Sequence, residues 1–185
     1  MGVLFEIIIY SILFAITMKI GDLFNEHGMK PWFPGSALFF GFFYGIIGLL
    51  LVFSDNILAN VILAMIIGYV LRHRIDYLNH GIAASIIIIG FLYRSVFDIN
   101  IFIPFFLAFA IFGLTEDFIS EKLKKKIKIP KRLPFYTLTG IVFGIIAGNW
   151  IILLSLFLFE FFYVITDIFG MKFINHQNNS LDKSL

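Results

Sequence analysis

The sequence contains no cysteine, and only 14% of its 185 residues are charged. Without cysteine, the chain has no disulfide bond, no thiolate metal site and no thiol redox centre. In contrast, 60% of the residues are hydrophobic and 25 of them are Phe, which is more than a soluble fold of this length requires. The composition therefore predicts a membrane protein whose main partner is the lipid bilayer.

Short polar stretches divide the chain into apolar segments. Several segments are shorter than the roughly 20 residues that cross a bilayer, but six of them pair into long stretches with polar or glycine tips, as helical hairpins do. The segments are 3–20, 37–53, 57–71, 82–97, 99–114, 134–148 and 149–169. Because the backbone must stay hydrogen-bonded inside lipid, we expect helices throughout. The pattern predicts an all-α polytopic membrane protein with about seven transmembrane helices in one domain (1–175) and a disordered polar tail (176–185).

The basic residues are distributed unevenly among the polar stretches. All but one of the 14 Lys and Arg residues fall on one side of the seven-segment arrangement, and Arg94 alone falls on the other. Cytoplasmic loops carry an excess of Lys and Arg, so we predict a multi-pass protein of the cell membrane with an outside N-terminus and a cytoplasmic C-terminus. The lysine-rich stretch 122–132 is explained by this membrane face, and we expect no nucleic-acid partner.

The two halves of the chain resemble each other. Residues 14–26 and 109–121 share Phe, Ala, Ile, Asp and Glu at matching positions, and Gly-x-x-x-Gly-Ile-Ile follows at 41–47 and 140–146. This similarity predicts a parallel 3+1+3 internal repeat, with halves at about 1–81 and 99–170 and a connecting helix at 82–97. Chance similarity between Phe- and Ile-rich segments is the alternative. The layout resembles that of the SWEET and PQ-loop transporters, although their Pro-Gln dipeptide is absent here. The glycines predict close helix packing.

Acidic side chains recur where the first, third, fifth and seventh segments end. Each of these ends carries an aspartate, and three of the aspartates are followed at i+4 by a second polar group, which a continued helix would place on the same face. A carboxylate at a helix C-terminus opposes the helix dipole, so the repetition needs an explanation. Hard cations such as Mg²⁺ take carboxylate ligands. The sequence predicts a Mg²⁺ cofactor held among Asp22, Glu26, Asp76, His80, Asp117, Glu121 and Asp167. Alternatively, these groups solvate the membrane face and pair with its lysines.

Basic side chains beside these acids favour a phosphate ligand. We predict that Lys19, Arg72 and Arg74 bind the substrate and that Asp22, Asp76 and Asp117 are catalytic. The first hypothesis is a Mg²⁺-dependent enzyme that acts on a lipid or prenyl (pyro)phosphate at the cytoplasmic face. The paired acids resemble the aspartate-rich motifs of UbiA-type membrane prenyltransferases, and the resemblance implies prenyl transfer. Those proteins carry N-D-x-x-D-x-x-x-D, whereas this chain has Gly21 before Asp22 and only D-x-x-x-E.

A different function is suggested by Glu160, which lies near the middle of the last apolar segment. An ionisable group at that depth is costly and is a functional hypothesis by default. The second hypothesis is therefore a small cation or solute transporter or channel built from two three-helix repeats. It predicts a polar path past Glu160, whereas the enzyme predicts converging aspartates. A third possibility is a non-catalytic membrane assembly protein.

Overall fold

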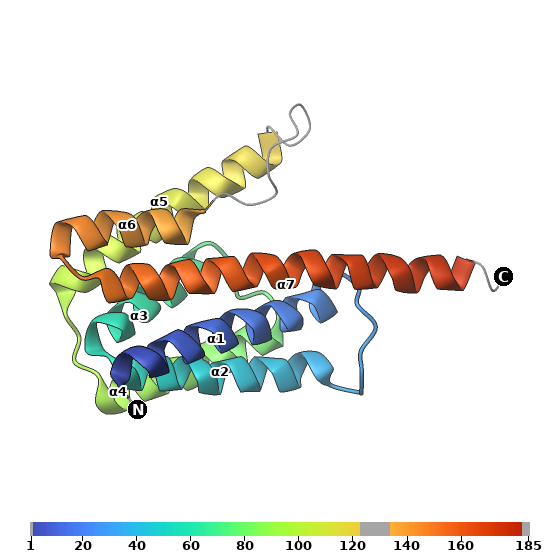
Figure 1. The fold of residues 1–185 in the computed structure, drawn as a ribbon, viewed down its shortest axis with the longest axis horizontal. Helices are drawn as coiled ribbons and strands as arrows, with labels where there is room; N and C mark the ends of the chain where they lie inside the picture. Colours follow the sequence, from blue (N-terminus) through green and yellow to red (C-terminus); the bar gives the residue numbers. More distant parts are fainter. Residues whose placement is uncertain (1, 123–133, 183–185) are drawn as a thin grey trace.

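The computed structural model describes residues 2–122 and 134–182, so most of the basic stretch at 122–132 lies outside the described residues. The described part is all-helical, without strands, and each helix overlaps one of the predicted apolar segments. The helices are α1 (Val3–Asn25), α2 (Ser36–Ser54), α3 (Asn56–Leu71), α4 (Leu78–Arg94), α5 (Ile99–Lys122), α6 (Phe135–Ala147) and α7 (Trp150–Asp182). Figure 1 shows α1, α2 and α7 lying side by side along the long axis. The predicted all-α class is confirmed.

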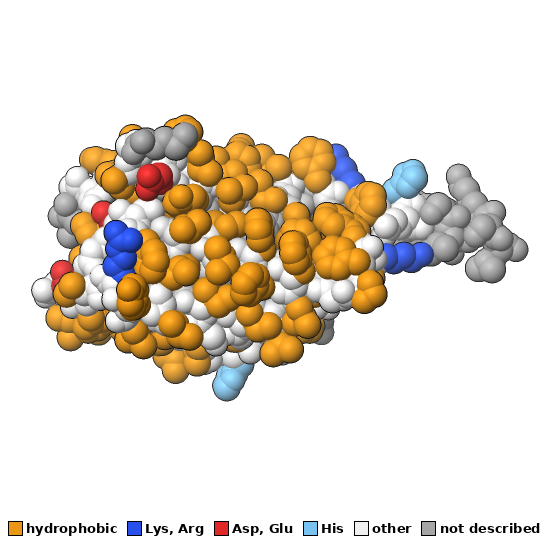
Figure 2. Space-filling view, turned by 90° about the horizontal axis from the view of Figure 1, so that it is seen from below, with side chains coloured by type: hydrophobic (Ala, Val, Ile, Leu, Met, Phe, Trp, Pro, Cys, Tyr) orange, Lys and Arg blue, Asp and Glu red, His pale blue; other side chains and the backbone are white. Residues whose placement is uncertain are grey.

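Three helices are long and apolar enough to cross a membrane. They are α1, α2 and the first part of α7, with spans Val3–Asn25, Ser36–Ser54 and Trp150–Gln177. The surface agrees with this assignment, because hydrophobic side chains cover the middle of the face in Figure 2, while Asp and Glu lie towards one end and Lys and Arg towards both ends. Such a band matches the hydrocarbon layer of a bilayer. These features indicate that the protein resides in a membrane.

Glycines allow two pairs of helices to approach closely. A Cβ built on Gly41 of α2 would lie 2.6 Å from the Cβ and 2.7 Å from the Cα of Asn79 in α4, and one on Gly45 would lie 2.9 Å from the Cα of Ala83. The Gly-x-x-x-Gly pattern of α6 likewise allows close packing against α7, since a Cβ on Gly140 would lie 3.0 Å from the Cα of Leu153. In lipid, such close backbone packing replaces the missing hydrophobic force between helices.

Several helix boundaries differ from the predicted segments, and those of α4 and α7 are the most informative. The helix α4 begins at Leu78 rather than at 82, because Asn79 and His80 are buried against neighbouring helices and do not belong to a loop. The helix α7 continues to Asp182, so the segment expected to be a disordered tail is helical as far as the structure describes it. No Pro or Gly interrupts residues 171–182, and the helix can therefore continue into the polar sequence.

The buried Asn60 of α3 joins this helix to the turn before α5. Its Nδ2 donates to the Val96 carbonyl over 2.9 Å, and its Oδ1 accepts from the Asp98 amide over 2.9 Å. We expect Asn60→Ala to lower the free energy of unfolding by about 1–3 kcal/mol, because the Asp98 amide loses its acceptor, whereas the Val96 carbonyl keeps a hydrogen bond from Asn56 Nδ2 at 3.1 Å. Denaturation in detergent micelles measures this loss. The exposed Asn100→Ala serves as control, and equal stability of the two variants would contradict the assignment.

Candidate functional site

A cavity of about 820 Å³ opens between the helices near the C-terminal end of α1. It brings side chains from both halves of the chain together. Charged and histidine side chains in its wall are Lys19, Asp22, Glu26, His27, Arg72, Arg74, His80 and Asp167. Tyrosines in its wall are Tyr44, Tyr69, Tyr136 and Tyr163. A cavity with convergent polar groups and this volume is the usual form of a ligand site.

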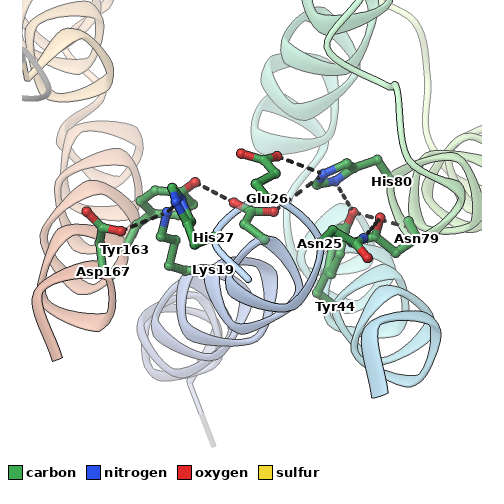
Figure 3. A network of polar contacts seen from close by, with 10 residues as sticks. Lys19, Asn25, Glu26, His27, Tyr44, Asn79, His80, Tyr163 and Asp167 are labelled. Carbon is green, nitrogen blue, oxygen red and sulfur yellow. Dashed lines mark hydrogen bonds and ion pairs between the residues drawn. The ribbon is translucent and has the colours of Figure 1, made fainter. Parts of the chain in front are cut away.

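An acidic cluster with one histidine forms one side of this cavity. Asp22 and Glu26 are separated by one turn of α1 and its continuation, and His80 stands on the first turn of α4. The Nε2 of His80 lies 3.4 Å from Asp22 Oδ1 and 3.7 Å from Glu26 Oε1 (Figure 3). One ligand atom from each of the three residues lies within 4.8 Å of the others. We call Asp22, Glu26 and His80 the cation cluster.

The burial of Asp22 is the most informative feature of the cation cluster. Its side chain is only 4% exposed. Its Oδ2 accepts a short hydrogen bond from the Tyr163 hydroxyl, whereas its Oδ1 has no hydrogen-bond partner among the described residues. A buried carboxylate needs a positive partner, and Asp22 Oδ1 obtains one either from a protonated His80 at 3.4 Å or from a cation held between Asp22, Glu26 and His80.

A second layer of contacts orients His80. The Tyr44 hydroxyl lies 2.8 Å from His80 Nδ1 and donates to the Asn79 carbonyl over 3.4 Å. Since the hydroxyl has one proton to give, it accepts from Nδ1–H. The Nε2 atom then either carries a proton that it donates to the carboxylates or, in the neutral ring, offers its lone pair to a metal ion. Such partners fix the tautomer of metal-binding histidines in proteins.

The charge of the cation cluster requires compensation. The neighbouring His80, as a hydrogen-bond partner, lowers the pKa of Glu26, so this carboxylate is ionised at neutral pH. Two carboxylates that face one imidazole nitrogen need a positive charge between them, which is either a proton on His80 or a metal ion. Both arrangements use the same atoms, and both give Asp22 Oδ1 a positive partner.

A basic group lies on the opposite side of α1 (Figure 3). The buried Lys19 Nζ lies 2.9 Å from Asp167 Oδ1 and 3.1 Å from His27 Nε2. It also lies 4.9 Å from the centre of the Tyr163 ring, whose hydroxyl binds Asp22. Tyr163 therefore couples the Lys19–Asp167 pair to the cation cluster through one side chain.

The structure separates the predicted metal ligands into groups. Of them, Asp22, Glu26 and His80 meet in the cation cluster, and Asp167 lines the same cavity but pairs with Lys19. Asp76 is exposed in the connection between α3 and α4 and lies outside the cluster. The predicted substrate-binding residues Lys19, Arg72 and Arg74 all line the cavity. The side chains of Asp117 and Glu121 lie outside the described residues.

Glu160, the predicted intramembrane acid, has a structural explanation. Its Oε2 accepts from the Thr137 amide over 3.0 Å and from Thr137 Oγ1 over 2.6 Å. Thr137 is the third residue of α6, whose first amides have no partner within the helix. Glu160 of α7 thus caps the N-terminus of α6, and its negative charge interacts favourably with the positive end of the α6 dipole.

We expect Glu160→Ala to lower the free energy of unfolding by about 2 kcal/mol while cation and phosphate binding are retained, because the Thr137 donors lose their acceptor. Thr166→Val is the matched control, since among the described residues the hydrogen bond of Thr166 Oγ1 goes to the Phe162 carbonyl of its own helix. Thermal unfolding in micelles measures both variants. Unchanged stability together with lost binding would assign Glu160 a functional role instead.

Two residues of the network, Tyr44 and Tyr163, are not evident from the sequence. Tyr44 lies inside the Gly-x-x-x-Gly segment of α2, where every neighbour is apolar or glycine, so only tertiary packing reveals its contact with His80. For Tyr163 the sequence gives a weak indication of a place in the site, because Tyr163 precedes Asp167 by one helical turn and lies on the same helix face.

Comparison of the chain with protein-family models, curated proteins and solved structures gave no match. The functional argument therefore rests on the cavity, the cation cluster and the basic residues beside them.

Proposed function

We propose that this protein is an integral membrane enzyme that holds a divalent cation, Mg²⁺, at Asp22, Glu26 and His80. Its substrate is a lipid or prenyl (pyro)phosphate whose head group enters the cavity. The observation that carries the proposal is the convergence of Asp22, Glu26 and His80, of which one ligand atom each lies within 4.8 Å of the others while Asp22 and His80 are buried. An acidic pocket with basic residues on its other side matches a cation and an anion bound together.

The ligand chemistry supports a metal–phosphate site. Mg²⁺ is commonly held by one or two carboxylates plus substrate phosphate oxygens, which matches Asp22 and Glu26. The imidazole of His80 widens the choice to Mn²⁺ and other transition ions, so a titration series belongs in the test. A cation at this position would stabilise negative charge on a departing phosphate group, and that is the largest contribution to rate in many phosphate reactions.

Basic side chains supply the second half of the site. Arg72 and Arg74 follow the end of α3 and line the cavity, where guanidinium groups can bind phosphate oxygens in pairs. Lys19 lies deeper and already neutralises Asp167. We propose that the arginines bind the phosphate and that Lys19 keeps the local charge balanced when it arrives.

We expect Arg72→Gln and Arg74→Gln each to weaken binding of Mg²⁺-pyrophosphate about tenfold, which is the effect of losing one charge-assisted phosphate contact. Cation affinity without pyrophosphate should stay within about twofold, because neither arginine belongs to the cation cluster. Isothermal titration of protein in lipid nanodiscs measures both affinities. Arg94→Gln, outside the cavity, is the control. Unchanged pyrophosphate binding in both arginine variants would remove them from the site.

The proposal also includes the membrane arrangement. We propose seven crossings with the N-terminus outside and the C-terminus in the cytoplasm, so that the cavity opens at the cytoplasmic face. Helix packing supports the 3+1+3 repeat, because α1 contacts α2 and α7 just as α5 contacts α6 and α3. These pairs correspond when the two halves are exchanged.

A transporter has less support than an enzyme. Transport requires a polar path near the bilayer centre, and Glu160 was the residue expected to line it. Glu160 instead binds Thr137 at the start of α6, and it is absent from the described lining of the cavity. The polar groups gather near the end of α1, which suits chemistry on a lipid head group.

A direct assay tests the proposed function. The purified protein in nanodiscs is incubated with prenyl diphosphates and Mg²⁺, and release of pyrophosphate is followed with and without a nucleophilic acceptor. We expect cation-dependent binding and release that stop when EDTA removes the metal. The absence of any cation-dependent binding of pyrophosphate or prenyl diphosphate would overturn the proposal.

A further inference from the structure

The cavity changes from polar to apolar with depth. On α1 its wall runs from Glu26 to Phe14, which spans about 18 Å at the helical rise per residue. On α4 it runs from His80 to Ile87, or about 10 Å. Because the two helices are antiparallel, Glu26 and His80 share the polar end, and Phe14 and Ile87 share the apolar end. The cavity therefore extends beyond the charged groups into the hydrophobic interior.

The deep end of the cavity has a defined floor. A Cβ built on Gly48 of α2 would lie 2.5 Å from Ile87 Cδ1 and 3.0 Å from Phe14 Cε2, so these two side chains meet over this glycine. The Phe14 ring is fixed by Phe159 at 5.5 Å and by Tyr44 at 5.9 Å between ring centres. Ile87 is buried. The floor is thus closed by packed side chains.

From this gradient we infer that the apolar half of the cavity binds a single hydrocarbon chain of the (pyro)phosphate substrate and that Ile87 and Phe14 limit its length. The inference rests on the proposed function, which places the head group at the polar end. Apolar walls favour a hydrocarbon over a sugar or nucleoside, because burial of each methylene group contributes favourably. The volume of about 820 Å³ falls in the range of pockets for one small ligand, which argues against a lipid with two long chains.

The test compares chain length at constant head group. Pyrophosphate and geranyl, farnesyl and geranylgeranyl diphosphate, each with Mg²⁺, are titrated into nanodisc-embedded protein, and phosphatidic acid provides a two-chain phosphate. We expect affinity to rise with chain length up to one member of the series and then to stop rising. Phosphatidic acid should bind at least about tenfold more weakly than that member.

Variants of the wall make the test specific. Ile87→Ala should move the preferred chain to the next longer member of the series, and Ala84→Leu, which narrows the wall above the floor, should weaken all prenyl diphosphates about tenfold. Neither change should alter binding of pyrophosphate itself. Ile89→Ala on the exposed face of α4 is the matched control. A thermal unfolding curve of each variant verifies that it is folded.

The outcomes distinguish the two proposals. Pyrophosphate that binds with Mg²⁺, together with chain preferences that follow Ile87 and Ala84, supports both. Pyrophosphate binding without any dependence on chain length, or equal binding of phosphatidic acid, overturns the chain-binding inference and leaves the proposed function intact. Failure of pyrophosphate and all prenyl diphosphates to bind overturns the proposed function itself.

Discussion

Asp22→Asn is expected to lower the affinity for divalent cations about 100-fold or more, which corresponds to roughly 3 kcal/mol. The substitution removes the negative charge of the buried carboxylate but keeps its shape and its acceptor for the Tyr163 hydroxyl. A cation that loses one of its two carboxylate ligands is bound much more weakly, because neither a neutral amide nor a water molecule replaces the lost negative charge. Titration of Mn²⁺ followed by its electron paramagnetic resonance measures this affinity.

The control for this experiment lies on the same helix. Glu6→Gln removes one charge at the other end of α1, outside the cavity, and should leave Mn²⁺ affinity within about twofold. The same prediction extends to turnover, which should fall with cation affinity. If Asp22→Asn and Glu6→Gln bind Mn²⁺ equally well, the acidic group near His80 is only an ion pair with a protonated histidine.

Gly41→Ala is expected to reduce the free energy of unfolding by about 2–3 kcal/mol, the usual effect of overpacking a well-packed contact. The new methyl group would lie 2.6–2.8 Å from Asn79 atoms, including its Cα and carbonyl oxygen, so the backbones of α2 and α4 must separate. Because Asn79 precedes His80, the shift also displaces one member of the cation cluster. We therefore expect a smaller, secondary loss of cation affinity.

An identical substitution on the facing helix provides the comparison. A Cβ on Gly81 of α4 meets nothing within 4 Å, so Gly81→Ala should be neutral or stabilise by about 0.5–1 kcal/mol through helix propensity. Unfolding by denaturant in micelles measures both proteins. Equal stabilities would show that α2 and α4 can separate without cost, against the packing described for the Gly-x-x-x-Gly segment.

The sequence predicts helices more reliably than it predicts the contacts among them. Long apolar runs locate each helix, since lipid demands internal hydrogen bonding. The spacing of Asp22 and Glu26 also holds, because α1 continues to Asn25. The start of α4 was missed, since Asn79 and His80 are polar and resemble a loop in sequence. Their burial against Gly41 and Tyr44 depends on packing across the chain, which no local pattern contains.

The four aspartates at the segment ends show that spacing in the sequence does not determine the direction in which each side chain points. In the sequence they occupy equivalent places at segment ends, and a shared role follows naturally. In the described structure Asp22 faces the cation cluster, Asp167 faces Lys19, and Asp76 is exposed. The rotation of each helix about its axis decides which way a side chain points, and tertiary packing sets that rotation. The same holds for Glu160, whose partner Thr137 lies on another helix.

The most direct measurement is the anomalous diffraction of Mn²⁺ in crystals of the protein soaked with Mn²⁺ and pyrophosphate. The proposed function predicts one strong peak between Asp22 Oδ1, Glu26 and His80 Nε2, at about 2.0–2.3 Å from the carboxylate oxygens, with pyrophosphate density next to it towards Arg72 and Arg74. A cation cluster without a peak, with His80 bonded directly to the carboxylates at saturating Mn²⁺, would contradict it.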